Sequence, residues 1–281
     1  MNRSTILRRP DREAAPGTEI LPGYDVVARL SHGHRLDTYD VYSRERDCRC
    51  VLKTVRADRA DEEPCRTALT REGTLLRDLS HPHLVRAYEV VEAPRAAVVL
   101  ETLTGATLAA LIEEGPLSVP DAVLLATQLT SVLGYLHHHG WLHLDVKPSN
   151  VVVQGGRAVL IDLSLAARPG DGRPHAGTWG YMAPEQSTGR DLSSAADVFG
   201  LGATLGEALT GRLPYGEEGR WRKPTDRTPG RAFRRRLDRV PEGLADLVQA
   251  CVDTDPNRRP TLPDVRAALR GLAEQAHPST L

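Results

Sequence analysis

The sequence is poor in aromatic residues, since two Phe, three Trp and seven Tyr make up only 4% of its 281 residues. Leu, Val and Ala must therefore form most of the hydrophobic core. Net charge is nearly absent as well, with 36 Lys and Arg against 37 Asp and Glu. The overall charge therefore gives no reason to expect nucleic-acid binding. A chain of this length suits one large domain or two lobes that share a cleft.

Cysteine is scarce too, and its spacing carries little chemistry. Cys48, Cys50, Cys65 and Cys251 form no Cys-x-x-Cys pair and match no zinc-binding pattern. Free thiols in a reducing compartment are the simpler interpretation. Cys48 and Cys50 share one face of a predicted strand, so a redox or metal role remains as a less favoured alternative.

Long apolar runs are missing, because no stretch approaches eighteen consecutive apolar residues. We therefore expect no transmembrane helix and no membrane insertion. The N-terminus is charged but lacks the apolar stretch of a signal peptide. These features predict a cytoplasmic protein.

The first part of the chain has the pattern of a small sheet. Residues 1–21 are polar and are expected to form a flexible arm. Alternating β-branched and aromatic residues predict three antiparallel strands over 24–56, and two more at 84–92 and 96–101. A helical period covers 63–79.

The second part is helical. Ser118 and Asp121 resemble a capping box at the start of a long apolar helix that stops at Gly140. Further helices are predicted at 193–211, 242–252 and 263–273. We therefore expect an α+β fold with a strand-rich lobe over 22–102 and a larger helical lobe over 103–273. Residues 274–281 would be a C-terminal tail.

One stretch is strongly basic. Between residues 220 and 239 only Asp226 and Asp238 are acidic. The basic residues are Arg220, Arg222, Lys223, Arg227, Arg231, Arg234, Arg235, Arg236 and Arg239. Two interpretations remain open, namely a docking surface for an acidic protein partner and a solvated loop. Few aromatic residues interleave with these charges, and no nucleic-acid partner is expected.

Phosphoryl transfer requires cations for the nucleotide phosphates, oxygen ligands for magnesium, and a base beside the acceptor hydroxyl. Residues 142–150 (LHLDVKPSN) place a carboxylate, an ammonium and an amide close together, and the apolar residues 158–161 lead to Asp162. These segments resemble the catalytic loop and the magnesium-binding motif of bacterial eukaryotic-like (Hanks-type) serine/threonine protein kinases. The resemblance extends to residues 177–185 (GTWGYMAPE), 197–202 and 255–260.

This resemblance covers roughly residues 24–272 and implies a two-lobed protein kinase-like fold. It also implies transfer of the ATP γ-phosphate to Ser or Thr hydroxyls of protein substrates, with ATP and Mg²⁺ or Mn²⁺ as cofactors. Asp145 matches the catalytic base, and Lys147 matches the lysine that neutralises the transferring phosphoryl group. Thr178 matches the threonine that bridges these two side chains.

The remaining site residues are also implied by the resemblance. Lys53 matches the strand lysine that holds the nucleotide phosphates, and Glu72 matches its helix partner. Asn150 and Asp162 match the two metal ligands, whose oxygen atoms suit a hard cation. Together with Lys53, Asn150 and Asp162, the predicted nucleotide-binding positions are Leu30, Gly33, Thr38, Val51, Leu100, Glu101 and Leu103.

Other matches have structural roles in the family. Glu185 and Arg259 resemble an ion pair that stabilises the helical lobe. Asp197 resembles the acid that accepts backbone N–H groups of the catalytic loop. The run of three histidines at 137–139 matches nothing comparable, and we interpret it as a solvated helix end in preference to a metal site.

The sequence departs from the family in the loop between its first two strands. Only Gly33 remains of three glycines, and Ser31 and Leu36 should stiffen this loop. Thr38 and Val51 would make a bulkier ceiling over the adenine. These changes favour an alternative in which the chain is a pseudokinase, a scaffold or binding module with weak or no ATP turnover.

A second departure concerns regulation. Leu144 replaces the arginine that usually grips a phosphate on the activation segment, and residues 165–177 contain no Ser, Thr or Tyr. We therefore expect no phosphorylation switch in this segment. Ser164 also replaces a glycine after Asp162.

Three functions can be weighed from these residues. All six polar groups of the transfer machinery are present, whereas a pseudokinase would be expected to lose at least one, so the sequence favours an active kinase. A kinase-fold enzyme acting on small molecules is disfavoured, because residues 177–185 resemble a peptide-substrate platform.

Overall fold

The computed structural model describes residues 14–93, 95–189, 191–216 and 228–276. The chain divides into two compact units. The first, here called the sheet unit, comprises Met1–Ser80 and Val85–Leu103, and the second, the helical unit, comprises His81–Leu84 and Thr104–Leu281. Most of the expected arm and the end of the expected tail lie outside the described residues.

The sheet unit is a six-stranded antiparallel sheet with the order β1-β2-β3-β4-β6-β5. Its strands are β1 (Glu19–Leu21), β2 (Tyr24–His32), β3 (Leu36–Ser43), β4 (Cys48–Val55), β5 (Ala87–Val91) and β6 (Ala97–Glu101). The five strands expected from the sequence are all present. β1 was not expected, because its three residues fall within the predicted arm, yet they pair with β2.

Two faces of this sheet have different neighbours. Tyr39 and Leu52 are cross-strand partners on a face that forms a buried apolar cluster. The opposite face carries Lys53 toward α1 (Glu63–Asp78). Helix α1 approaches the strands closely at Gly73, where a Cβ would lie 2.4 Å from a methyl group of Val98. This close approach brings α1 to a position where it can supply a partner for Lys53.

The cysteines give no support to a redox or metal role. All four are free thiols, and Cys48 is exposed while Cys50 is buried. Burial, together with the neighbouring Cys48, raises the pKa of Cys50 to about 11. A thiol with such a high pKa is a poor nucleophile and a poor metal ligand at neutral pH.

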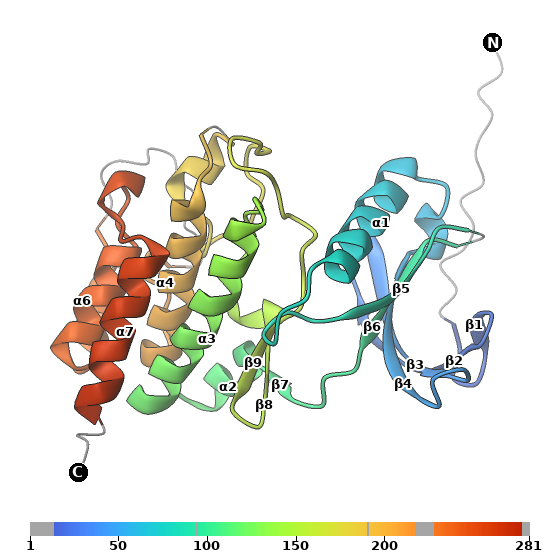
Figure 1. Cartoon of the computed structure of the whole chain (residues 1–281), viewed down its shortest axis with the longest axis horizontal. Helices are drawn as coiled ribbons and strands as arrows, with labels where there is room; N and C mark the ends of the chain where they lie inside the picture. The colour runs from blue at the N-terminus through green and yellow to red at the C-terminus, as the bar shows by residue number, and fades with distance from the viewer. Residues whose placement is uncertain (1–13, 94, 190, 217–227, 277–281) are drawn as a thin grey trace. The chain divides into compact units, whose positions relative to one another are not determined.

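The helical unit contains a small antiparallel sheet and six α-helices among its described residues (Figure 1). The sheet has the order β7-β8-β9. Its strands are β7 (Ala106–Thr107), β8 (Val151–Gln154) and β9 (Arg157–Leu160). The helices are α2 (Leu108–Glu114), α3 (Val119–His138), α4 (Ser194–Thr210), α5 (Arg231–Leu237), α6 (Glu242–Cys251) and α7 (Leu262–Ala276).

Helix α3 is the central helix of this unit. Its expected cap is present, since Ser118 Oγ accepts a hydrogen bond from the backbone N–H of Asp121. By length and composition alone α3 could cross a membrane, but half of its most apolar window is buried within the protein. It packs against α4 and α7, which stand beside it in Figure 1. Its apolar character is therefore explained by its place in the core.

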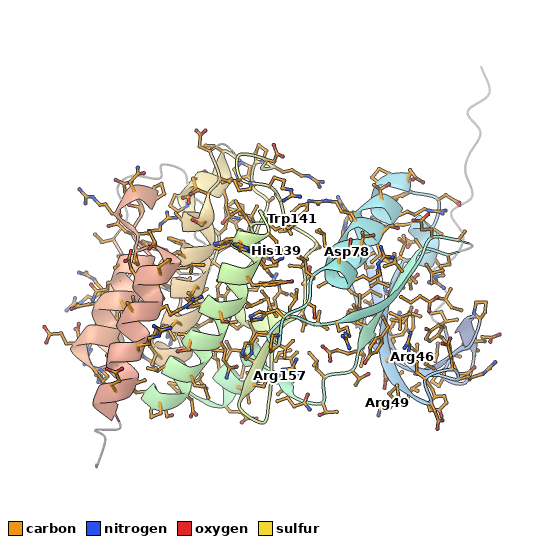
Figure 2. The ribbon with its side chains drawn as sticks, viewed as in Figure 1. Arg46, Arg49, Asp78, His139, Trp141 and Arg157 are labelled. Atoms are coloured by element: carbon orange, nitrogen blue, oxygen red, sulfur yellow. The ribbon has the colours of Figure 1, made fainter. Side chains whose placement is uncertain are left out.

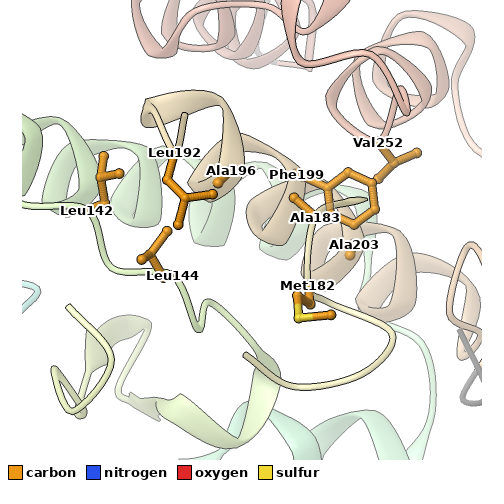
Figure 3. Packing of buried hydrophobic residues seen from close by; sticks show 9 residues of the cluster. All are labelled: Leu142, Leu144, Met182, Ala183, Leu192, Ala196, Phe199, Ala203 and Val252. Atoms are coloured by element: carbon orange, nitrogen blue, oxygen red, sulfur yellow. The ribbon is translucent and has the colours of Figure 1, made fainter. Parts of the chain in front are cut away.

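A buried apolar cluster lies beside the start of α4 (Figure 3). It joins Leu142 and Leu144 of the predicted catalytic loop to Leu192 and to Phe199 of α4. The cluster gives the loop a rigid base, because both leucines are no more than 4% exposed. The α+β expectation is confirmed, with an antiparallel sheet in one unit and mainly helices in the other.

Candidate active site

The catalytic loop is held at its start by one buried carboxylate. Asp197, in the first turn of α4, accepts hydrogen bonds from the backbone N–H groups of His143 at 2.8 Å and Leu144 at 2.7 Å. The imidazole of His137 donates a third, at 2.7 Å. Asp197 is only 1% exposed, so these three donors replace its hydration.

Asp197 is ionised despite its burial. Burial alone would raise the pKa of this carboxyl group, but the hydrogen bond from His137 and the nearby His143 outweigh it and leave the pKa below its ordinary value. His137 therefore has a structural partner, which differs from the expectation of a solvated histidine run. His139 follows the end of α3 and is exposed.

The turn after α3 is fixed by an arginine that the sequence did not single out. Arg168 donates to the carbonyl oxygens of His139 at 2.9 Å and Gly140 at 3.0 Å. Its guanidinium also lies over the ring of Trp141, 4.0 Å from the centroid. Figure 2 labels Trp141 and His139 at this end of the helix. The turn that leads into the catalytic loop is thereby tied to the activation segment.

Asp145, Lys147 and Thr178 form a closed set of contacts. Lys147 Nζ lies 2.7 Å from Asp145 Oδ2 and donates to Thr178 Oγ1 at 2.6 Å. Thr178 in turn donates to Asp145 Oδ1 at 2.7 Å. All three side chains are partly exposed, so a substrate can reach them. The structure thus brings together the three residues that the resemblance assigned to proton and charge handling.

The two predicted metal ligands lie at one end of the β8–β9 hairpin. Asn150 directly precedes β8 and Asp162 follows β9 by two residues. The backbone N–H of Ile161 donates to the carbonyl oxygen of Asn150 at 3.0 Å, which closes this end of the hairpin. Asn150 Nδ2 donates hydrogen bonds to the carbonyl oxygen and the carboxylate of Asp145. The Oδ1 atom of Asn150 is therefore the one suited to a cation. An amide oxygen and a carboxylate match a hard metal ion.

In the sheet unit, Lys53 and Glu72 form the predicted ion pair. Lys53 Nζ lies 2.7 Å from Glu72 Oε1, and the two side chains are 12% and 2% exposed. A buried glutamate without a cation would be costly, so the pair fixes the position of Lys53. Thr38 is the cross-strand partner of Lys53 and lies on the same face of the sheet.

The other predicted nucleotide-binding residues belong to the same unit. Leu30 near the end of β2 is 56% exposed. Val51 and Leu100 are cross-strand partners, while Glu101 ends β6 and Leu103 ends the unit. Each unit therefore carries its own part of the predicted machinery.

The loop around Gly33 is held by side chains that the sequence did not single out. Arg56 donates from its side chain to the carbonyl oxygen of Gly33 at 3.2 Å and from its backbone to that of Arg35 at 3.0 Å. His32 Nδ1 lies 2.7 Å from the buried Asp37. The loop is thus defined although only one glycine remains. In the sequence, the only feature that could have suggested these contacts is the position of Arg56 directly after β4.

The structural matches take the expected contacts. Arg259 binds Glu185 through two hydrogen bonds of 2.6 and 2.9 Å. Ser164 donates from its backbone to Asp162 Oδ1 at 2.7 Å. Replacement of glycine by serine therefore leaves Asp162 with a backbone donor.

Known proteins resemble this chain in sequence over most of its length. The family model described as "Protein kinase domain" matches residues 24–269. The serine/threonine-protein kinase PkaA of Streptomyces coelicolor is 34% identical over 235 residues, which are 80% of this chain and 43% of PkaA. PknD of Mycobacterium tuberculosis is 30% identical over 207 residues, 71% of this chain and 31% of PknD. The chain thus spans less than half the length of these relatives.

Solved structures have the same fold. The double mutant C20A_R136A of the Mycobacterium tuberculosis PknI kinase domain has a TM-score of 0.72 and 25% sequence identity. The comparison covers 94% of this chain and 100% of that one. From the family match over most of its length, this chain belongs to the protein kinase domain family, and its relatives are bacterial serine/threonine kinases of the Hanks type.

Proposed function

We propose that this chain is an active serine/threonine protein kinase that transfers the γ-phosphate of ATP to Ser or Thr hydroxyls of protein substrates. The observation that carries the proposal is the closed contact of Asp145, Lys147 and Thr178. A lysine two residues after the base, bridged to it by a threonine, is the arrangement that the family uses for Ser and Thr acceptors.

The residues fit the cofactors that protein kinases use, which are ATP and a divalent cation. Asn150 and Asp162 offer oxygen donors for Mg²⁺ or Mn²⁺, and Lys53, oriented by Glu72, would hold the phosphates. When bound, the cation neutralises charge on the phosphates.

The protein's own groups then handle the acceptor. Asp145 orients the substrate hydroxyl and takes its proton on a carboxylate oxygen as the oxygen attacks. Asn150 Nδ2 holds that carboxylate at 3.0 Å, while Lys147 supplies positive charge beside it. Thr178 keeps Asp145 and Lys147 in place.

The direct test is incubation with labelled ATP, magnesium and a generic basic protein substrate. The proposal expects label on Ser and Thr. Absence of transfer, together with absence of a thermal shift with ATP, would instead support the pseudokinase suggested by the degenerate loop. Against that alternative, Arg56 and the contact of His32 with Asp37 hold the loop although only one glycine remains in it.

We also propose that the activation segment works without a phosphorylation switch. Leu144 is 4% exposed and packs in the apolar cluster with Leu192, as Figure 3 shows. A side chain buried among apolar groups cannot pair with a phosphate. Leu144, at the position where the family usually has a phosphate-binding arginine, instead holds the catalytic loop in place by packing.

Phosphatase treatment is therefore expected to leave the transfer rate unchanged within about twofold. Such a change corresponds to under about 0.5 kcal/mol in activation free energy. Mass spectrometry of the treated protein is the control that phosphate has been removed, in particular from Thr178. A large loss of activity on treatment, restored by rephosphorylation of Thr178, would contradict the absence of a switch.

The basic stretch supports a proposal about a partner. Residues 220–227 lie outside the described residues, but α5 is docked by the buried Phe233 and Leu237. Its exposed arginines include Arg231, Arg234 and Arg235. We infer that α5 presents these charges to an acidic protein partner.

Replacing Arg231, Arg234 and Arg235 with Glu should weaken binding of an acidic partner at low salt by about tenfold or more and leave autophosphorylation unchanged. Arg236 is kept, because it donates to the carbonyl oxygen of Thr210 at 2.7 Å and so holds α5 in place. Co-purification of the triple variant and of the wild-type chain measures the effect. Equal recovery of partners would argue against α5 as a docking surface.

The free thiols support a further proposal, that the domain works in a reducing compartment such as the cytoplasm. Fractionation of cells that produce the chain tests it. Recovery in an oxidising fraction, such as the culture medium, would contradict it.

A further inference from the structure

One buried side chain, Gln186, joins three stretches of the helical unit. Its Nε2 donates to the carbonyl oxygens of Leu144 and Ala176, each at 2.9 Å. Its Oε1 accepts from the backbone N–H of Ala183 at 2.9 Å. Because Gln186 is only 2% exposed, water does not compete for these contacts, and both amide hydrogens are used.

The backbone around Gln186 continues the same connection. The N–H of His175 donates to the carbonyl oxygen of Gln186 at 2.9 Å, and that of Gly170 donates to Leu192 at 2.8 Å. Since the residue numbers fall on one side as they rise on the other, the activation segment runs antiparallel to the chain after Gln186.

Small residues let these two stretches lie in contact. A Cβ on Gly189 would lie 2.5 Å from the backbone nitrogen of Pro174, and one on Gly177 would lie 3.1 Å from Nε2 of Gln186. Gly189 and Gly177 also have positive φ angles, which disfavour larger residues. The contact therefore depends on backbone surfaces that only glycine leaves open.

These contacts flank the catalytic set on both sides. Leu144 immediately precedes Asp145, and Ala176 lies two residues before Thr178. A side chain that binds Leu144 and Ala176 fixes the distance between the two chain segments that carry Asp145 and Thr178.

We propose that Gln186 is a positioning residue that holds the activation segment against the catalytic loop and thereby keeps Thr178 in contact with Asp145. The consequence for catalysis rests on the proposed kinase function, whereas the effect on the segment does not.

The test replaces Gln186 with Met, which has a similar length but can neither donate nor accept as an amide does. Hydrogen exchange of residues 165–177, measured by mass spectrometry, is expected to become about tenfold faster or more, because the segment loses the bond from Gln186 to the carbonyl oxygen of Ala176 and opens more often. Unchanged exchange in this segment would overturn the proposal.

A matched control exists in the same unit. Gln128 also bridges by its side-chain amide, donating to the carbonyl oxygen of Gly156 at 2.8 Å and accepting from Ala158 at 2.6 Å. Gln128→Met should speed exchange in the β8–β9 hairpin and leave residues 165–177 as they are. Equal effects of both variants on 165–177 would mean general loosening and would overturn a specific role for Gln186.

Kinetics give an independent readout. Gln186→Met should lower kcat by about tenfold or more through misplacement of Thr178. The KM for ATP should change much less, since Gln186 makes no hydrogen bond to any predicted nucleotide-binding residue. A raised KM for ATP at unchanged kcat would contradict the role. If the wild-type chain transfers no phosphate, the kinase proposal fails, while hydrogen exchange still decides whether Gln186 holds the segment.

Should Gln186→Met fail to fold, Gln186→Glu provides a second variant. A protonated carboxyl group can donate to one carbonyl oxygen, whereas a carboxylate donates to none and repels both. Activity of Gln186→Glu should therefore fall as pH rises, relative to wild type. A pH profile that parallels those of wild type and of Gln128→Glu would overturn the proposal.

Discussion

Replacing Asp145 with Asn should reduce phosphoryl transfer by about a hundredfold to ten-thousandfold, the usual contribution of a general base. The amide cannot take the proton of the acceptor hydroxyl. It also leaves the ammonium of Lys147 without its carboxylate partner, now 2.7 Å away. The rate is measured with labelled ATP and a protein substrate at saturating magnesium.

Asp246→Asn is a suitable control for this variant. Asp246 is an exposed aspartate on α6 in the same unit, so the same change of charge should leave transfer unaffected. Comparable thermal stability of Asp145→Asn and wild type would show that the loss is chemical. Retained transfer in Asp145→Asn would remove Asp145 from the role of base.

The second large effect concerns the support of the catalytic loop. Asp197→Ala is expected to lower the free energy of unfolding by about 3 kcal/mol or more, since each buried group that loses its partner costs about 1–3 kcal/mol. The groups concerned are the N–H donors of His143 and Leu144 and the imidazole of His137. Urea unfolding of variant and wild type measures the difference.

The ionisation of Asp197 also predicts how stability depends on pH. The pKa of Asp197 is lowered in the folded protein, so folding favours its ionised form. Its contribution is complete above the unfolded pKa of about 3.9 and is lost as the pH falls through the lower folded pKa. Asp197→Ala should therefore differ most from wild type above about pH 4. A difference below about 0.5 kcal/mol at neutral pH, the size of an ordinary surface substitution, would show that the carboxylate is dispensable.

Much of the site could be predicted because its chemistry is local in sequence. Asp145, Lys147 and Asn150 lie within one loop, and the hairpin that follows returns the chain to Asp162. The long helices were also predictable, since apolar periodicity and the Ser118 cap act within one element. Lys53 and Glu72 were identified by resemblance, and their contact needed the packing of α1 on the sheet.

The rest depends on contacts between distant residues. Gln186 has little local signal, because its amide donates to carbonyl oxygens 42 and 10 residues away and only its bond from Ala183 is local. From the sequence, α5 was recognisable only as part of a basic stretch. Phe233 and Leu237, four residues apart, are its buried side chains. Arg56 acts on a loop 23 residues earlier. Side chains of this kind acquire a role only when the fold brings their partners together.

The proposed function requires this kinase fold to carry out phosphoryl transfer, which a scaffold alone would not do. The most direct measurement is a single-turnover reaction of the wild-type chain with γ-labelled ATP and magnesium, followed by phosphoamino-acid analysis beside Asp145→Asn. We expect label on Ser and Thr for wild type and almost none for the variant. Binding of ATP without label on any protein would contradict it.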